Sequence, residues 1–186
     1  MTRLRAGALT IVAVLGLSGL SGCYLGPDPI QFAALAVVDG KPTAFVAVCG
    51  RSTVDVEVYR NDKDDYTNTL LTWSVTVAPP DRARSVDVEL LGAVRPGWRL
   101  TTVRHTVDEG QPGSFEVIPL TAFEPGHRYA LDSSDPGPEG SSAPTVLFTV
   151  DDLTKVPDGQ VLVPEDHDHS KLMTREAFAR DRCGAG

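Results

Sequence analysis

Apolar residues follow one another in short runs from Ile30 onward, and turn-forming residues separate the runs. Gln31–Val38 and Ala44–Cys49 are almost wholly apolar, which is typical of central strands that are covered on both faces. Asp39–Pro42 lies between them and contains glycine and proline, so it predicts a turn that joins the two strands in a hairpin. Val54–Val58 alternates apolar and acidic residues, as expected for a strand with one solvated face.

The same reasoning predicts about ten strands, with turns spaced roughly every 8–15 residues. No segment between them has a long 3.6-residue period, so crossover helices are not expected and the pattern favours an all-β sandwich over a parallel α/β fold. In Leu71–Val77 the alternation points Trp73 inward. One helix is predicted, at 175–182, with Thr174 as its N-cap. The remaining predicted strands are Val86–Leu90, Trp98–Val107, Phe115–Phe123, His127–Leu131, Thr145–Val150 and Gln160–Val163.

The stretch Leu120–Tyr129 contains a leucine, a Pro-Gly turn and a tyrosine. It resembles the E–F corner of fibronectin-III and related immunoglobulin-like domains, where these residues recur at similar spacing. In that corner the Pro-Gly pair sets the turn, and the tyrosine hydroxyl reaches back to the backbone while its ring packs inward. The resemblance implies this role for Tyr129. Together with the strand pattern, it predicts an all-β, immunoglobulin-like β-sandwich with a short C-terminal helix.

The first 22 residues have the pattern of a secretory signal peptide. Arg3 and Arg5 precede an uncharged, mostly apolar run, 6–20, that is too short to span a bilayer comfortably. The run ends in Leu-Ser-Gly before Cys23 and resembles a bacterial lipobox, in which an apolar residue and two small ones precede a cysteine. This resemblance implies that residues 1–22 are removed and that Cys23 is diacylated on sulfur. The alternative is an ordinary signal peptide with a chance cysteine.

The lipobox resemblance also implies a location. Two acyl chains on Cys23 would hold the protein on a membrane far more strongly than one chain, so we expect a lipoprotein at the outer face of the cytoplasmic membrane. A lipidated tether, 23–29, then leads into a single domain, 30–186. The six tether residues after the cysteine span roughly 20 Å when extended, so the domain is expected close to the headgroups. The whole chain is similar to small actinobacterial lipoproteins of unassigned function.

Acidic residues outnumber basic ones in this chain. It contains 25 Asp and Glu against 17 Lys and Arg, and without residues 1–22, which carry two arginines and no acid, the formal charge is −10. A charge of this sign argues against nucleic-acid partners and against a membrane contact made by basic patches. The expected partners are the membrane, reached through the N-terminal lipid, and an unknown envelope protein or wall component.

Cys49 and Cys183 are the two cysteines that remain once Cys23 is assigned to lipidation. Free thiols are a liability in the oxidising compartment that an exported chain reaches, so we expect these two residues to form a disulfide. Cys49 ends an apolar strand and Cys183 follows the predicted terminal helix, so the bond would pin the helix to the sandwich. The alternatives are a lone reactive thiol and an intermolecular bond.

Residues 165–169 combine three carboxylates and two histidines and form the candidate metal site of this sequence. His167 and His169 share a face if the segment is extended. Imidazole together with the carboxylates of Asp166 and Asp168 suits Zn²⁺ or Cu²⁺ better than Ca²⁺. The alternative is a solvated linker before the terminal helix. Apart from this divalent cation, no cofactor is expected.

The chain after Cys23 contains no Gly-x-Ser-x-Gly nucleophile motif, no phosphate loop and no dinucleotide fingerprint. His105 and His127 lie in strand-like runs, where lone histidines are mostly packing or surface residues. We therefore expect a non-catalytic binding or accessory domain that uses the loops at the ends of the sandwich, including 61–69 and 132–144. Two alternatives stay open: a divalent-metal-binding lipoprotein that uses the 165–169 cluster, and a cell-envelope hydrolase with an unrecognised site.

Overall fold

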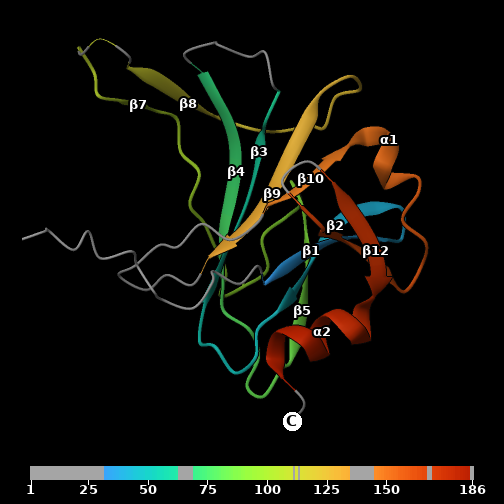
Figure 1. The fold of residues 1–186 in the computed structure, drawn as a ribbon. Coiled ribbons are helices and arrows are strands. Elements are labelled where there is room, and N and C mark those ends of the chain that lie inside the picture. The colour runs from blue at the N-terminus through green and yellow to red at the C-terminus, as the bar shows by residue number, and fades with distance from the viewer. Residues whose placement is uncertain are drawn as a thin grey trace, which may run out of the picture.

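The structure, a computed structural model, describes residues 32–62, 69–110, 112, 114–134, 145–166 and 169–184. These residues form two β-sheets packed face to face, with a short helix near the C-terminus (Figure 1). The predicted all-β, immunoglobulin-like sandwich with a short C-terminal helix is confirmed. The expected signal peptide, 1–22, and tether, 23–29, lie outside the described residues, so the lipidation of Cys23 stays a prediction.

The first sheet contains, in spatial order, β12 (Ser170–Thr174), β11 (Gln160–Pro164), β1 (Ala33–Val38), β2 (Lys41–Ala47) and β5 (Ser85–Glu89). β1 and β2 form the predicted hairpin, with their residues paired from Ala33–Val46 to Val38–Lys41. The two turn residues between them, Asp39 and Gly40, have φ of 50° and 74°. Aspartate and glycine tolerate this left-handed conformation better than other residues, which explains the sequence of the turn.

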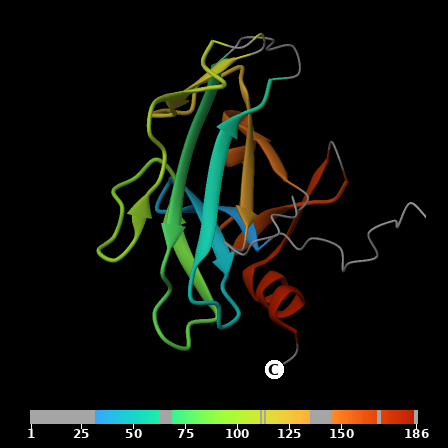
Figure 2. The ribbon, with the colours of Figure 1, turned by 90° about the vertical axis from the view of Figure 1, so that its left-hand side faces the viewer.

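The second sheet contains, in spatial order, β10 (Val146–Thr149), β9 (Arg128–Ser134), β3 (Val54–Arg60), β4 (Thr69–Val77), β8 (Phe115–Pro119) and β7 (His105–Val107), and β6 (Arg99–Leu100) also pairs with β4. Among the described residues, the strand pairs of both sheets run antiparallel except for β4 and β8, which run parallel. β8 pairs with the first residues of β4, and β6 pairs with its last residues. Figure 2 shows the long strands β3 and β4 side by side.

Two hydrophobic cores lie on opposite faces of the first sheet. The main core fills the space between the sheets and includes Trp73, which is 6% exposed and points inward as predicted. The second core lies between the first sheet and helix α2 (Arg175–Cys183), where Phe178 packs against Phe45 with ring centroids 6.1 Å apart. Successive residues of β1 enter the two cores alternately. Its continuous apolar run is therefore explained by burial on both faces.

Helix α2 is fixed at both ends. The Thr174 side chain accepts a hydrogen bond from the Ala177 backbone N–H at 3.1 Å, which confirms the predicted N-cap. At the other end, Cys183 is disulfide-bonded to Cys49, with the two Cα atoms 5.0 Å apart. The predicted pairing is therefore confirmed, and it holds the helix against the first sheet. The helix extends one residue beyond the predicted range of 175–182.

Parts of the strand prediction are wrong. Trp98–Val107 forms two short strands, because beyond Thr101 the Ser74 backbone N–H donates to the Thr102 hydroxyl instead of to a backbone carbonyl. The predicted strand 115–123 ends at Pro119, the last residue of β8. β12 was not predicted, since its mostly polar and exposed residues carry no alternating apolar signal. The last residue of the predicted strand 145–150 begins a short helix instead, α1 (Val150–Leu153).

Candidate functional site

The segment between β8 and β9 forms a tyrosine corner, as its sequence implies. Tyr129 is 1% exposed, and its hydroxyl oxygen accepts a hydrogen bond from the Glu124 backbone N–H at 2.8 Å. The ring of Tyr129 packs edge-on against Phe123, with centroids 4.9 Å apart. Because the buried Tyr129 contacts Phe123 and Glu124, and the Leu120 N–H donates to the Thr72 carbonyl oxygen, the backbone of residues 120–124 is positioned by the core rather than by solvent.

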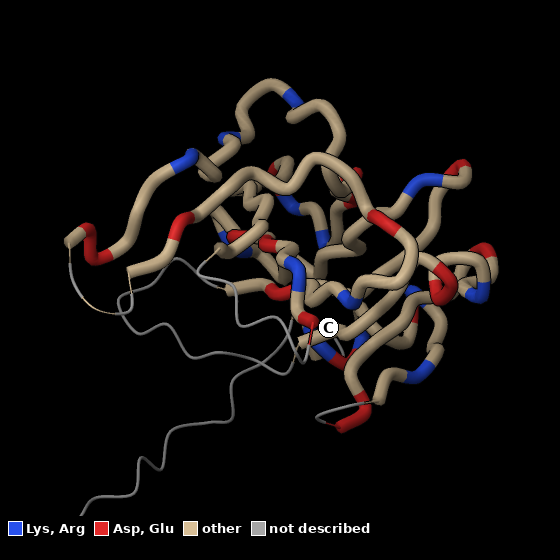
Figure 3. The backbone as a smooth tube through the Cα atoms, turned by 90° about the horizontal axis from the view of Figure 1, so that it is seen from above, with Lys and Arg blue, Asp and Glu red and all other residues tan. Residues whose placement is uncertain are grey.

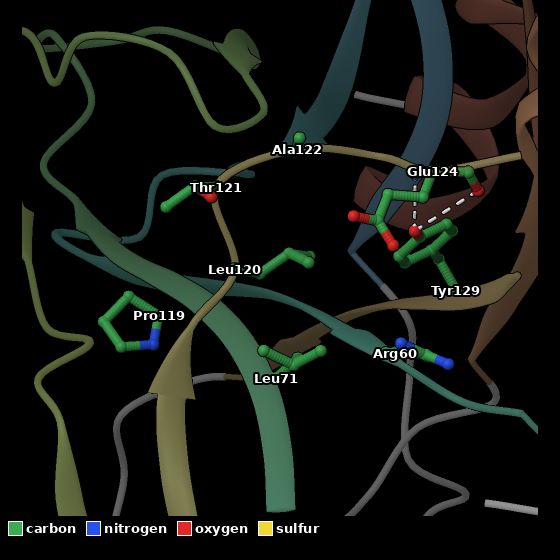
Figure 4. Close-up of a pocket in the computed structure, with 8 residues that line it drawn as sticks. All are labelled: Arg60, Leu71, Pro119, Leu120, Thr121, Ala122, Glu124 and Tyr129. Atoms are coloured by element: carbon green, nitrogen blue, oxygen red, sulfur yellow. Dashed lines mark hydrogen bonds between the residues drawn. The ribbon is translucent and has the colours of Figure 1, made fainter.

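A shallow hollow, partly open to solvent, lies beside this corner (Figure 4). Its lining combines the apolar side chains of Leu71 and Leu120 with the polar side chains of Arg60, Thr121 and Glu124. In Figure 4 the two leucines lie in the middle, and Arg60 and Glu124 lie together on one side. The hollow is therefore lined by a mixture of polar and apolar groups, unlike the mostly apolar lining of a small-molecule pocket.

Asp62 organises the same end of the second sheet through three hydrogen bonds. Its carboxylate oxygens accept from Arg60 Nε at 2.6 Å, from His127 Nδ1 at 2.8 Å and from the Arg128 backbone N–H at 2.8 Å. The second ring nitrogen of His127, Nε2, lies 3.7 Å from Glu124. Asp62 therefore links the end of β3 to the start of β9, and Arg60 connects this cluster to the hollow.

Burial of the Asp62 carboxylate raises its pKa, but hydrogen bonds from Arg128, Arg60 and His127 outweigh burial and lower the pKa from 3.8 to about 2. A lowered folded-state pKa means that the charged group stabilises the fold above its unfolded pKa, and that this stabilisation is lost as pH falls through the folded pKa. The side chain keeps 20% of its surface exposed, so solvent screens it only in part.

We expect Asp62→Asn to lower the free energy of unfolding by about 1–2 kcal/mol at neutral pH. The difference between the variant and the native protein should shrink as pH falls from about 4 to below 2, because Asp62 is protonated first in the unfolded chain and, below about 2, also in the folded protein. Urea denaturation of both proteins at a series of pH values measures this difference in the free energy of unfolding. A difference that stays constant across that range would show that the charge of Asp62 is not what holds the cluster.

The outer face of the second sheet, away from the main core, carries two facing carboxylates. Glu57 of β3 and Asp132 of β9 are opposite each other in the antiparallel register. Burial, with a contribution from the negative charge of Glu57, raises the pKa of Asp132 above its ordinary value. Thr72 donates its hydroxyl hydrogen to Glu57 at 2.7 Å. Carboxylates are among the residue types that act in general acid–base catalysis, so these two residues are where the hydrolase alternative can be tested.

The predicted metal stretch, 165–169, lies at the turn between β11 and β12 rather than in a linker before the helix. His169 Nδ1 is 2.8 Å from a carboxylate oxygen of Asp166, and the His169 backbone N–H donates to the same carboxylate at 2.9 Å. His167 and Asp168 lie outside the described residues. Among the residues that the structure describes, no group of three or more metal-ligating side chains comes together.

The two loops predicted to bind a partner leave the second sheet at opposite ends. Loop 61–69 follows β3 at the end where Arg60 pairs with Tyr129, whereas 132–144 continues from the other end of β9, where Ser134 pairs with Asp55. Most of both loops lies outside the described residues. The hollow and the Asp62 cluster therefore lie at the same end of the second sheet as the start of loop 61–69. We take the hollow and the cluster together as the candidate functional site.

Sequence reasoning missed the contacts of this site for identifiable reasons. Asp62 and His127 are 65 positions apart, and His127 was interpreted as a packing or surface residue. Asp132 lay one residue beyond a predicted strand that ended at Leu131. Two signals were present in the sequence: the Pro-Gly and tyrosine spacing located the corner, and the predicted partner loop, 61–69, contained Asp62 without singling it out.

Comparison of the chain with protein-family models, curated proteins and solved structures finds no match. In the part of the chain that the structure describes, no helix has the length and hydropathy needed to cross a membrane. The site is consequently interpreted from its own residues: a corner fixed by Tyr129, a hollow beside that corner, and a charged cluster around Asp62 that Arg60 connects to the hollow.

Proposed function

We propose that this chain is a lipid-anchored, extracytoplasmic binding domain without catalytic activity of its own. The observation that carries the anchoring is Leu-Ser-Gly before Cys23, at the end of an uncharged run that follows two arginines. The bond between Cys49 and Cys183 supports export, since disulfides persist in oxidising compartments and are rare in the cytosol. The anchor would keep the domain at the outer face of the cytoplasmic membrane.

The hollow at the tyrosine corner supports a binding role. Thr121 and Ala122 are exposed at its rim, while Tyr129 and Leu120 beneath them are buried in the core. A loop that is exposed but held by a buried ring changes little in shape when a partner binds, which lowers the entropic cost of association. We therefore assign partner recognition to this end of the sandwich, with an envelope protein or a wall component as the class of partner.

The anchoring is tested by Cys23→Ala in the native host. We expect the native protein to require detergent for release from membranes, and the variant to appear in the soluble fraction or to accumulate unprocessed, since it has no thiol to acylate. Intact-mass analysis of the native protein should show Cys23 as the first residue with acyl chains attached. An unmodified N-terminus at another residue would contradict the proposal.

The binding role is tested separately by a photo-reactive residue at position 121 in intact cells. We expect a discrete cross-linked product that weakens when Ala122→Trp fills the hollow. A probe at exposed Lys171, on β12 in the other sheet, is the matched control and should give no such product. Equal products from both positions, or no effect of Ala122→Trp, would remove the hollow from the proposed function.

A further inference from the structure

The outer margin of the second sheet is formed by one continuous segment, Arg95–Val107, which we call the outer-edge strip. It includes β6, which pairs with the last residues of β4, and β7, which pairs with the outer side of β8. The Thr101 backbone N–H donates to the Ser74 carbonyl oxygen at 2.9 Å, so β4 also holds the segment between the two strands. The strip therefore follows the sheet edge from one end of the sandwich toward the other.

The strip differs in charge and polarity from the rest of this acidic chain. Residues 95–107 contain three arginines, one histidine and no acidic residue, although the whole chain has a net charge of −8. Leu100 is 49% exposed and Val103 is 63% exposed, and they are two of the three large exposed apolar residues in the described part of the chain. Figure 3 shows blue segments following one another along this outer rim, up to the acidic turn at 108–109.

The three arginines are exposed and are only partly neutralised within the protein. Arg104 pairs with Glu116 of β8 at 2.8 Å. Arg95 lies over the ring of Trp98, 5.1 Å from its centroid, which leaves its charge in place. Arg99 forms no ion pair with any residue that the structure describes. Cations beside exposed apolar side chains match a surface that offers anionic headgroups above hydrocarbon, whereas a soluble polyanion offers no apolar layer.

The N-terminal segment leaves the fold at the end of the sandwich where the strip begins. Arg99 pairs with Thr76, Thr76 pairs with Asp55, and Asp55 pairs with Ser134 in one row across the sheet. The neighbouring residue, Ser133, accepts the backbone N–H of the first described residue, Phe32. Three strand spacings along this row are about 15 Å.

The chain between Cys23 and Phe32 is long enough to reach across this row. Nine residue steps separate the two positions, and they span about 30 Å when extended. A lipid on Cys23 could therefore lie in the same bilayer that the strip contacts. Because an anchored domain has a high effective concentration at the membrane, even a weak contact would set its orientation.

We propose that the outer-edge strip docks the domain edge-on against an anionic bilayer. This proposal rests on the proposed anchoring, and its occupant is the membrane itself. The arginines face the headgroups and Leu100 and Val103 enter the interface. In this orientation the main axis of the sandwich lies along the membrane, and the hollow at the tyrosine corner opens sideways along the surface.

The test uses the full-length lipidated protein, reconstituted into vesicles with brominated acyl chains. Trp98 lies in the strip and the only other tryptophan, Trp73, is buried in the main core, so bromine quenching reports contact of the strip with the bilayer. We expect Trp98 emission to be quenched at least about twofold more on vesicles with one-third phosphatidylglycerol than on pure phosphatidylcholine. Salt at about 0.5 M should remove the difference by screening.

Charge variants distinguish the effect of the arginines in the strip from the effect of the protein's net charge. Arg95→Gln/Arg99→Gln/Arg104→Gln should reduce quenching to the neutral-vesicle level. A second triple variant, Lys41→Gln/Lys171→Gln/Arg180→Gln, removes the same charge from exposed sites elsewhere and should leave quenching unchanged. Glu116→Gln, which frees Arg104, should increase quenching. In Trp98→Phe, only Trp73 remains and its emission should not respond to the vesicles.

The other possible outcomes of the quenching experiment each contradict either the docking of the strip or the lipid anchor. Equal quenching on neutral and anionic vesicles, or equal loss in the two triple variants, would overturn the proposal. A Trp98 response to soluble polyphosphate but not to anionic vesicles would assign the strip to a polymer and likewise overturn it. Failure of the protein to float with neutral vesicles would instead count against the anchor. The anionic vesicles would still test the strip in that case, since docking alone brings Trp98 to the bilayer.

Discussion

Replacing both Cys49 and Cys183 with alanine is expected to lower the free energy of unfolding by about 4–5 kcal/mol. The disulfide joins residues 134 positions apart. In the chain-entropy account, removing so long a loop constraint gives the denatured chain correspondingly more freedom. The loss should be read from urea denaturation, followed by the fluorescence of buried Trp73.

Chemical reduction of the native protein is the matched control for this double variant. Reduction breaks the same bond while keeping both side chains in place, so it should lower stability by a similar amount. The double variant should not respond to reductant at all. A double variant within about 1 kcal/mol of the native protein would show that the bond constrains little in the denatured chain.

Phe178→Ala is expected to cost about 3–5 kcal/mol of stability, the usual range for truncating a fully buried phenylalanine. Phe178 is 0% exposed and is the buried residue through which α2 packs on the first sheet. The alanines of β1 and β2 beneath the helix, Ala34, Ala36 and Ala47, are too small to fill the space that the ring leaves. Denaturation in urea measures the cost.

Two further variants separate packing from helix formation. Glu176→Ala changes an exposed residue of the same helix and should alter stability by less than about 0.5 kcal/mol. Phe178→Leu keeps most of the apolar volume and should cost clearly less than Phe178→Ala. Since Phe178 and the disulfide both hold α2, combining their losses should cost less than the sum of the separate losses. A fully additive result would mean that the two contacts stabilise independent parts of the fold.

Local patterns in the sequence predicted the elements whose signals are themselves local. The continuous apolar runs around residues 33–47 indicated two-sided burial, because a strand with helix on one face and sheet on the other has no polar side. The corner at Tyr129 could be located because its leucine, turn and tyrosine fall within ten residues. β12 escaped prediction because an edge strand needs no buried alternation to be held by its neighbour.

The polar part of the candidate site could not be predicted in this way. Asp62 meets His127 only because β3 and β9 are neighbours in the second sheet, and strand order is set by packing rather than by any local signal. The same holds for Glu57 and Asp132. Net charge is likewise a chain average: a value of −8 does not report that residues 95–107 carry three arginines and no acidic residue.

The hydrogen bonds at the start of β1 also determine how a pull on the N-terminal segment would reach the two sheets. The backbone N–H groups of Phe32 and Ala33 both donate to Ser133 Oγ at 2.9 Å, which ties the start of β1 to the opposite sheet. β1 is an interior strand, paired with β2 along its whole length. Tension from an N-terminal anchor would load the hydrogen bonds between β1 and β2 together, in shear, instead of breaking them one at a time. An N-terminal anchor would thus be attached to both sheets at once, to the second sheet through Ser133 and to the first through the pairing of β1 with β2.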